Sequence, residues 1–128
     1  MEFFRGINLN TTEEYLQKYL RLNSLDKLSN EIFNLKTPSE EVADIGGIWG
    51  EFTLSRNEIN GGIRFALLEC PNALCWTVTT GFPPDPESTV IHLTVNRQQI
   101  SQEFIEEIEE FLDDHSECLK RVLSIEES

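Results

Sequence analysis

Apolar residues in the first third of the chain recur at helical spacing. Thr11 and Glu14 form a capping box, in which two side chains satisfy free backbone amides at the start of a helix. The apolar positions that follow lie on one helical face: Tyr15, Leu16, Tyr19 and Leu20. Asn23 and Ser24 interrupt this helix, and Ser24 can cap a second one that runs to Lys36. The apolar positions of that second helix are Leu25, Leu28, Ile32 and Leu35.

Two further segments complete the N-terminal part of the chain. Residues 1–10 show no clear apolar period and are predicted to be a lead-in without regular structure. Thr37 and Pro38 repeat a capping signal, because proline fits the first position of a helix. A third helix is therefore predicted here, and it is short because Gly46 and Gly47 end it.

From Ile48 onward the apolar period changes from that of a helix to the alternation of strands. Asn60 and Gly61 favour a tight hairpin turn, since both central positions of such a turn need a positive φ. The prolines between residues 81 and 88 keep that segment out of a strand ladder. Short connections imply an antiparallel meander. Four strands are predicted, over residues 48–56, 63–68, 74–80 and 89–95.

The last segment returns to helical spacing, and Ser101 can cap its start. Its apolar stripe consists of Phe104, Ile105, Ile108, Phe111, Leu112, Leu119, Val122 and Leu123. The predicted fold class is therefore α+β, with N-terminal helices, a four-stranded antiparallel meander sheet, and a long C-terminal amphipathic helix packed on one sheet face. A length of 128 residues is that of one domain, so we expect a single domain over residues 1–128.

Composition narrows the class of protein. A hydrophobic content of 39% is that of a globular chain, so global disorder is not expected. No apolar run is long enough to cross a bilayer, and the N-terminus lacks the apolar stretch of a signal peptide. Three cysteines, Cys70, Cys75 and Cys118, are an odd number that fits a reducing compartment, so a cytoplasmic location is expected.

Charge is unevenly distributed along the chain. The formal net charge is −13, and eight carboxylates lie between Ser101 and Lys120 with no basic residue among them. Nucleic acids and anionic membranes require basic surfaces, so neither is expected as a partner. The eight carboxylates are placed opposite the apolar stripe of the last helix: Glu103, Glu106, Glu107, Glu109, Glu110, Asp113, Asp114 and Glu117.

This acidic helix face has two interpretations. Like charges four residues apart cost a few tenths of a kcal/mol each, which a helix built for stability alone would avoid by interleaving lysines. The face is therefore either a docking surface for a basic protein or a solvated surface that keeps the protein soluble. A proline-rich loop beside the sheet is a second recognition candidate. The predicted partner-binding residues are Glu106, Glu107, Glu110, Asp113, Asp114, Glu117, Phe82 and Asp85.

The sequence gives weaker signals for a metal site or a catalytic site than for the acidic helix face. Cys70 and Cys75 flank a turn, and His115 and Cys118 lie one helical turn apart, but these spacings are not those of a usual zinc site. His115 falls within the apolar stripe, where a core histidine with satisfied hydrogen bonds is the simpler interpretation. No nucleophile elbow, phosphate loop or zinc-protease motif is present. No cofactor, metal or enzymatic activity is therefore predicted.

A small acidic protein without catalytic motifs is best interpreted as a binding protein. The leading hypothesis is an intracellular inhibitor or immunity-type protein that neutralises a basic partner, such as a nuclease toxin, by covering its positively charged substrate surface. One alternative is an adaptor or secretion chaperone that binds an apolar segment. Another is a small enzyme or metal-binding protein that uses Cys75, His92 and Cys118.

Overall fold

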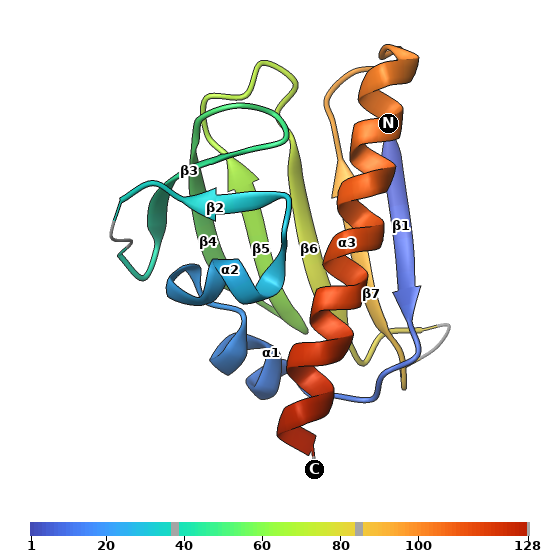
Figure 1. Cartoon of the computed structure of the whole chain (residues 1–128). Coiled ribbons are helices and arrows are strands. Elements are labelled where there is room, and N and C mark those ends of the chain that lie inside the picture. Colours follow the sequence, from blue (N-terminus) through green and yellow to red (C-terminus); the bar gives the residue numbers. More distant parts are fainter. Residues whose placement is uncertain (37–38, 84–85, 128) are drawn as a thin grey trace.

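A single antiparallel sheet of seven strands forms the body of the molecule, and one long helix lies across it (Figure 1). The computed structural model describes residues 1–36, 39–83 and 86–127, with side chains as far as residue 124. The strand order in the sheet is β1-β7-β6-β5-β4-β3-β2, and all neighbouring strands run antiparallel. The elements are β1 (Glu2–Ile7), α1 (Glu13–Tyr19), a 3-10 turn η1 (Leu22–Ser24), α2 (Leu25–Leu28), β2 (Ile32–Asn34), β3 (Val42–Gly47), β4 (Phe52–Ile59), β5 (Gly62–Leu67), β6 (Cys75–Thr80), β7 (Thr89–Thr94) and α3 (Gln102–Glu127).

The prediction of a four-stranded sheet is wrong, although the α+β class is right. The four predicted strands correspond to β4–β7, which do lie side by side in the sheet. Three further strands extend it at both edges. Residues 1–10, expected to lack regular structure, contain β1, which pairs with β7 over its whole length. The pairing partner of β1 is nearly ninety residues away. Because this distant pairing specifies the strand, the local sequence shows no apolar period that predicts it.

The predicted second helix, from Ser24 to Lys36, is also wrong. Helix α2 ends at Leu28, and the chain then enters β2. Leu28 and Ile32 are four residues apart, a spacing that fits a helical stripe and a strand face equally well. Pairing with β3 decides between them, because Gly47 has no side chain to keep the backbone of Glu31 and Ile32 away.

The predicted third helix is replaced by β3. Its proposed start at Thr37 and Pro38 lies outside the described residues. The Ser39 hydroxyl accepts hydrogen bonds from the backbone amides of Glu41 and Val42, so it closes a turn instead of starting a helix. Beyond this turn Ala43 and Ile45 alternate into the core, as a strand requires.

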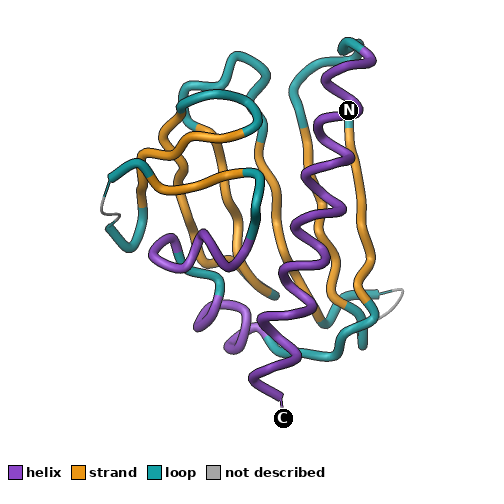
Figure 2. Tube along the Cα trace, viewed as in Figure 1, coloured by secondary structure: helices purple, strands orange, loops and turns teal. Residues whose placement is uncertain are grey.

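Helix α3 begins as the sequence predicts. The Ser101 hydroxyl accepts a hydrogen bond from the Phe104 amide at 3.1 Å, and the Ser101 carbonyl accepts the first helical bond from Ile105. The helix runs along the sheet face above β6, β7 and β1, while α1 and α2 cover the neighbouring strands (Figures 1 and 2). Within the described residues no helix combines the length and apolarity that crossing a membrane would require.

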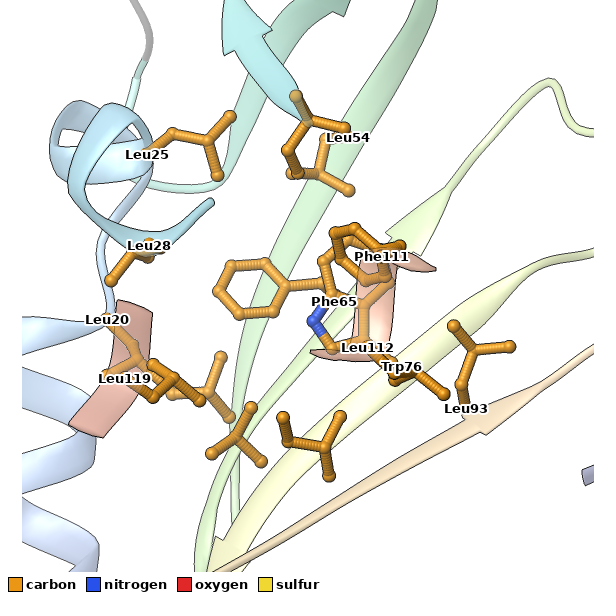
Figure 3. Close-up of a cluster of buried hydrophobic side chains, with 14 of the residues drawn as sticks. Leu20, Leu25, Leu28, Leu54, Phe65, Trp76, Leu93, Phe111, Leu112 and Leu119 are labelled. Carbon is orange, nitrogen blue, oxygen red and sulfur yellow. The ribbon is translucent and has the colours of Figure 1, made fainter. Parts of the chain in front are cut away.

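The core lies between the sheet and the helices (Figure 3). Phe65 and Trp76 point inward from neighbouring strands and contact each other, with ring centroids 5.2 Å apart. Phe111 approaches Trp76 edge-on from α3 at 5.0 Å. Each of these rings is at most 1% exposed, and burying one such side chain contributes about 2 kcal/mol. This packing holds α3 rigidly on the sheet, so its outer face is fixed in space.

Candidate functional site

The outer face of α3 carries a row of exposed carboxylates. They lie opposite the buried side of the helix, which is formed by Ile108, Phe111 and Leu112, as the helical period predicts. We define the acidic ridge as the exposed members of this row: Glu103, Glu106, Glu109, Glu110, Asp113 and Glu117. Because the helix is anchored in the core, these charges share one fixed surface.

Few cations compensate the acidic ridge. Asp113 accepts a hydrogen bond from Nε of Arg5 on β1 at 2.9 Å, and Glu117 pairs with Lys120 at 3.2 Å. Among the residues that the structure describes, no ion pair reaches the other four members of the ridge. The ridge therefore remains strongly negative at neutral pH.

Asp114 lies on the flank of α3 that faces α2, and its carboxylate is occupied within the protein. It accepts hydrogen bonds from the Ser29 hydroxyl, the Asn30 amide nitrogen and the Asn30 side chain, each at 2.8 Å. Burial by itself would raise the pKa of this carboxyl, but the bonds from Ser29 and Asn30 together lower it. Asp114 thus fastens the segment after α2 to α3.

Glu31 is a carboxylate of this surface that sequence reasoning missed. It follows the Ser29–Asn30 anchor, and it faces Glu110 and Asp114 of α3. Partial burial raises its pKa, and the negative charges of Glu110 and Asp114 raise it further. Residues 24–36 were predicted to be helical, so no sequence signal placed Glu31 beside α3. Glu31 therefore adds a third carboxylate beside Glu110 and Asp114.

Glu107 lies at the other end of the same flank, beside a shallow apolar pocket. Trp49, Phe52 and Phe104 contribute to the lining of this pocket, which measures about 310 Å³. Trp49 contacts Phe111 edge-on, with ring centroids 5.0 Å apart. Within the described part of the chain its indole nitrogen is buried without a hydrogen-bond partner. The pocket thus places apolar side chains directly beside the Glu107 carboxylate.

Phe82 lies on the opposite face of the sheet from the acidic ridge. Its ring covers Gly61 in the β4–β5 turn, and the side chain is 49% exposed. Together with Phe4 and His92 it borders a hollow of about 460 Å³ on this outer face. The structure therefore does not bring Phe82 together with the predicted carboxylates, and Asp85 lies outside the described residues.

The cysteine and histidine side chains are dispersed through the structure. Cys75 contacts Thr94 on the outer sheet face, whereas Cys118 lies on α3 beside Asn30 and Asp114. Within the described residues no three His, Cys, Asp or Glu side chains are grouped so that they could hold a metal ion. His115 is fully buried, and desolvation lowers its pKa to about 4, so it is neutral at pH 7.

Comparisons with known proteins identify the fold. No family model and no curated protein matches the chain. Protein XoxI from Bacillus cereus superposes with a TM-score of 0.66 at 13% identity, covering 99% of this chain and 98% of that one. A START superfamily protein from Mycobacterium smegmatis gives 0.60 at 13%, covering 97% and 98%. An uncharacterized protein from Bacillus thuringiensis gives 0.57 at 11%, covering 91% and 97%.

These structural similarities show that the chain has a START-like fold, in which a curled antiparallel sheet packs against a C-terminal helix. The seven-stranded sheet replaces the predicted four-stranded meander on this evidence as well. In this protein Phe65, Trp76 and Phe111 fill space between the sheet and α3. The outer surface of α3, by contrast, carries the exposed carboxylates of the acidic ridge.

Proposed function

We propose that this protein binds and neutralises a basic protein, which docks on the acidic ridge of α3. One observation carries the proposal: Glu103, Glu106, Glu109 and Glu110 are exposed on a rigid helix, and no ion pair among the described residues reaches them. A basic partner would supply the missing cations.

The energetics of the ridge favour a charged partner. Like charges four residues apart on α3, such as Glu106 and Glu110, destabilise the helix by a few tenths of a kcal/mol. A cation brought by a partner offsets this repulsion. It also offsets the repulsion that Glu110 and Asp114 exert on the ionised Glu31 carboxylate. The field of a fixed acidic surface further accelerates encounter with a positive surface.

The partner class follows from the same electrostatics. Enzymes that act on nucleic acids bind phosphates through lysine and arginine surfaces, and an acidic ridge competes for such a surface. We therefore propose an inhibitor or immunity-type role against a basic enzyme, with a nuclease toxin as the leading example. All three cysteines are free thiols, which fits a reducing compartment and supports a cytoplasmic site of action.

A charge-reversal pair of variants tests this function. In the ridge variant Glu106, Glu110 and Glu117 are changed to lysine, which moves the formal net charge from −13 to −7, since each change adds two. In the control variant Glu40, Glu41 and Glu51, which are exposed and lie outside α3, are changed to lysine, so its net charge equals that of the ridge variant. Partners recovered from the native host on each protein are identified by mass spectrometry, and the purified partner is then titrated by surface plasmon resonance.

We expect a basic partner that binds the wild type and the control variant but not the ridge variant. Its association rate should fall steeply as salt is added, because exposed charges are screened over about 10 Å at 0.1 M salt. An enzymatic activity of the partner should be inhibited by the wild type at equal stoichiometry. A partner that binds the ridge variant as tightly as the wild type would contradict the proposal.

A further inference from the structure

Strand β1 leaves one edge of the sheet open beside the acidic ridge (Figure 1). Met1 and Val95 exchange hydrogen bonds between their backbones, each at 3.0 Å. Bonded and non-bonded pairs alternate along an antiparallel ladder, so Phe3 and Arg5 also bond to β7. The intervening residues point their N–H and C=O groups toward the open edge: Glu2, Phe4 and Gly6.

Arg5 shows what this edge can hold. Its Nη1 donates a hydrogen bond to the Phe4 carbonyl at 3.0 Å, which is one of the outward-facing groups. Its Nε donates at the same time to Asp113 on α3 at 2.9 Å. A guanidinium thus fits between the edge of β1 and the flank of α3, and it satisfies both a strand carbonyl and a ridge carboxylate.

The two faces of this edge differ in chemistry. On the inner face, the side that α3 covers, Asp113 and Glu109 lie one helical turn apart on the flank beside β1. On the outer face Phe4 is 57% exposed and stacks on His92 at 4.3 Å, next to the hollow near Phe82. A Cβ added to Gly6 would meet no atom within 4 Å, so this face has room for another side chain.

We propose that an extended segment of the basic partner adds to the sheet as an antiparallel strand along β1. This inference rests on the proposed function and specifies where and how the partner binds. Residues of the added strand would alternate, with arginine or lysine on the inner face toward Glu109 and Asp113, and apolar side chains on the outer face beside Phe4. Its backbone would bond to Phe4 and Gly6, and an incoming arginine would replace Arg5 at the edge.

Matched peptides test the backbone part of the proposal. The probe is a short synthetic peptide in which arginine and valine alternate, and its affinity is measured by fluorescence anisotropy. In the added strand the valines lie opposite Phe4 and Gly6, so valine amides face β1 and arginine amides face away. N-methylation of the valine amides should therefore weaken binding about tenfold or more, because at least two hydrogen bonds are lost. N-methylation of the arginine amides should leave the affinity within about threefold.

Two variants of one position test the edge itself. Gly6→Pro removes an outward N–H that β7 does not use, and an edge strand tolerates proline at such a position. Gly6→Ala keeps this N–H and adds a methyl group in open space. We expect Gly6→Pro to weaken the alternating peptide about fivefold or more and Gly6→Ala to bind as the wild type does. Circular dichroism melts of both variants confirm that the fold is retained.

Each outcome separates this proposal from the proposed function. If N-methylation and the Gly6 substitutions all leave the peptide affinity unchanged, while the ridge variant no longer binds the native partner, strand addition is wrong and the ridge function stands. If the ridge variant binds the native partner as tightly as the wild type does, but N-methylation of the valine amides weakens the peptide, strand addition stands and the ridge function is wrong. If the alternating peptide fails to bind the wild type even at low salt, strand addition is overturned.

Discussion

Trp76 on β6 donates a hydrogen bond from its indole Nε1 to Nε2 of His115 on α3, at 3.3 Å. An indole can only donate, so Nε2 is the acceptor and the imidazole proton lies on Nδ1. Nδ1 then donates to the Leu28 carbonyl at the end of α2, at 2.6 Å. One neutral histidine therefore ties the sheet, α2 and α3 together inside the core.

This arrangement predicts a loss of stability in mild acid that depends on His115. Its pKa is about 4 in the folded protein because of burial, and 6.5 is its ordinary value. Between these values the unfolded chain binds a proton that the folded protein excludes, so the free energy of unfolding falls as pH is lowered from about 6.5 to about 4. The total loss is on the order of 3 kcal/mol.

Urea denaturation of the wild type and of His115→Gln, from pH 7 to pH 4.5, measures this effect. The variant should be less stable at pH 7, because a buried network is disturbed. The difference between the two proteins should then shrink as the pH falls. A constant difference across this range would show that His115 does not resist protonation.

Adjacent carboxylates on α3 should respond very differently to removal. Asp114→Ala leaves the Ser29 hydroxyl and two Asn30 donors without their acceptor and should cost about 2 kcal/mol of stability. Asp113→Ala breaks an ion pair whose carboxylate is 71% exposed and should cost less than about 1 kcal/mol. Chemical denaturation of the two variants gives both values, and equal losses would mean that Asp114 does not anchor the α2–β2 segment.

Two glycines of the sheet should differ in the same way. A Cβ on Gly62 would overlap the carbonyl oxygen of Val78 on the neighbouring strand, so Gly62→Ala must push β5 and β6 apart. We expect a loss of about 2 kcal/mol or more for this variant. Gly6→Ala meets open space and should stay within about 0.5 kcal/mol of the wild type. Thermal melts that rank the variants in the reverse order would contradict the described register of β5 and β6.

Glu31→Gln should stabilise the protein at pH 7. The pKa of Glu31 is raised by partial burial and by Glu110 and Asp114, so its ionised form is less favourable in the folded protein than in the unfolded chain. Removing this charge should raise the Tm at low salt, and the gain should shrink at high salt because the repulsion is screened. Glu41→Gln, at an exposed position away from α3, serves as the control. A lower Tm for Glu31→Gln would show that its carboxylate is held by favourable contacts.

The elements that sequence reasoning found are those with strong local signals. The β4–β5 hairpin has an Asn60–Gly61 turn between alternating strands, and α3 has a capping serine and a long apolar stripe. Strands β1, β2 and β3 lack such signals. The partner of β1 is distant in sequence, whereas β2 and β3 each pair with the next strand along the chain. In β2 the same apolar residues satisfy either a helix or a strand, so only pairing could decide.

The acidic stripe of α3 could likewise be predicted from the order of residues, because helical spacing alone places its carboxylates opposite the apolar side. What tertiary structure decided is how each carboxylate is used. Asp114 became an anchor because Ser29 and Asn30 fold against it, and Glu31 joined the surface because the segment that leads from α2 into β2 lies against α3. The open edge of β1 also exists only in the assembled sheet. Local periodicity determines one element at a time, whereas burial, pairing and the meeting of charges depend on contacts between distant segments.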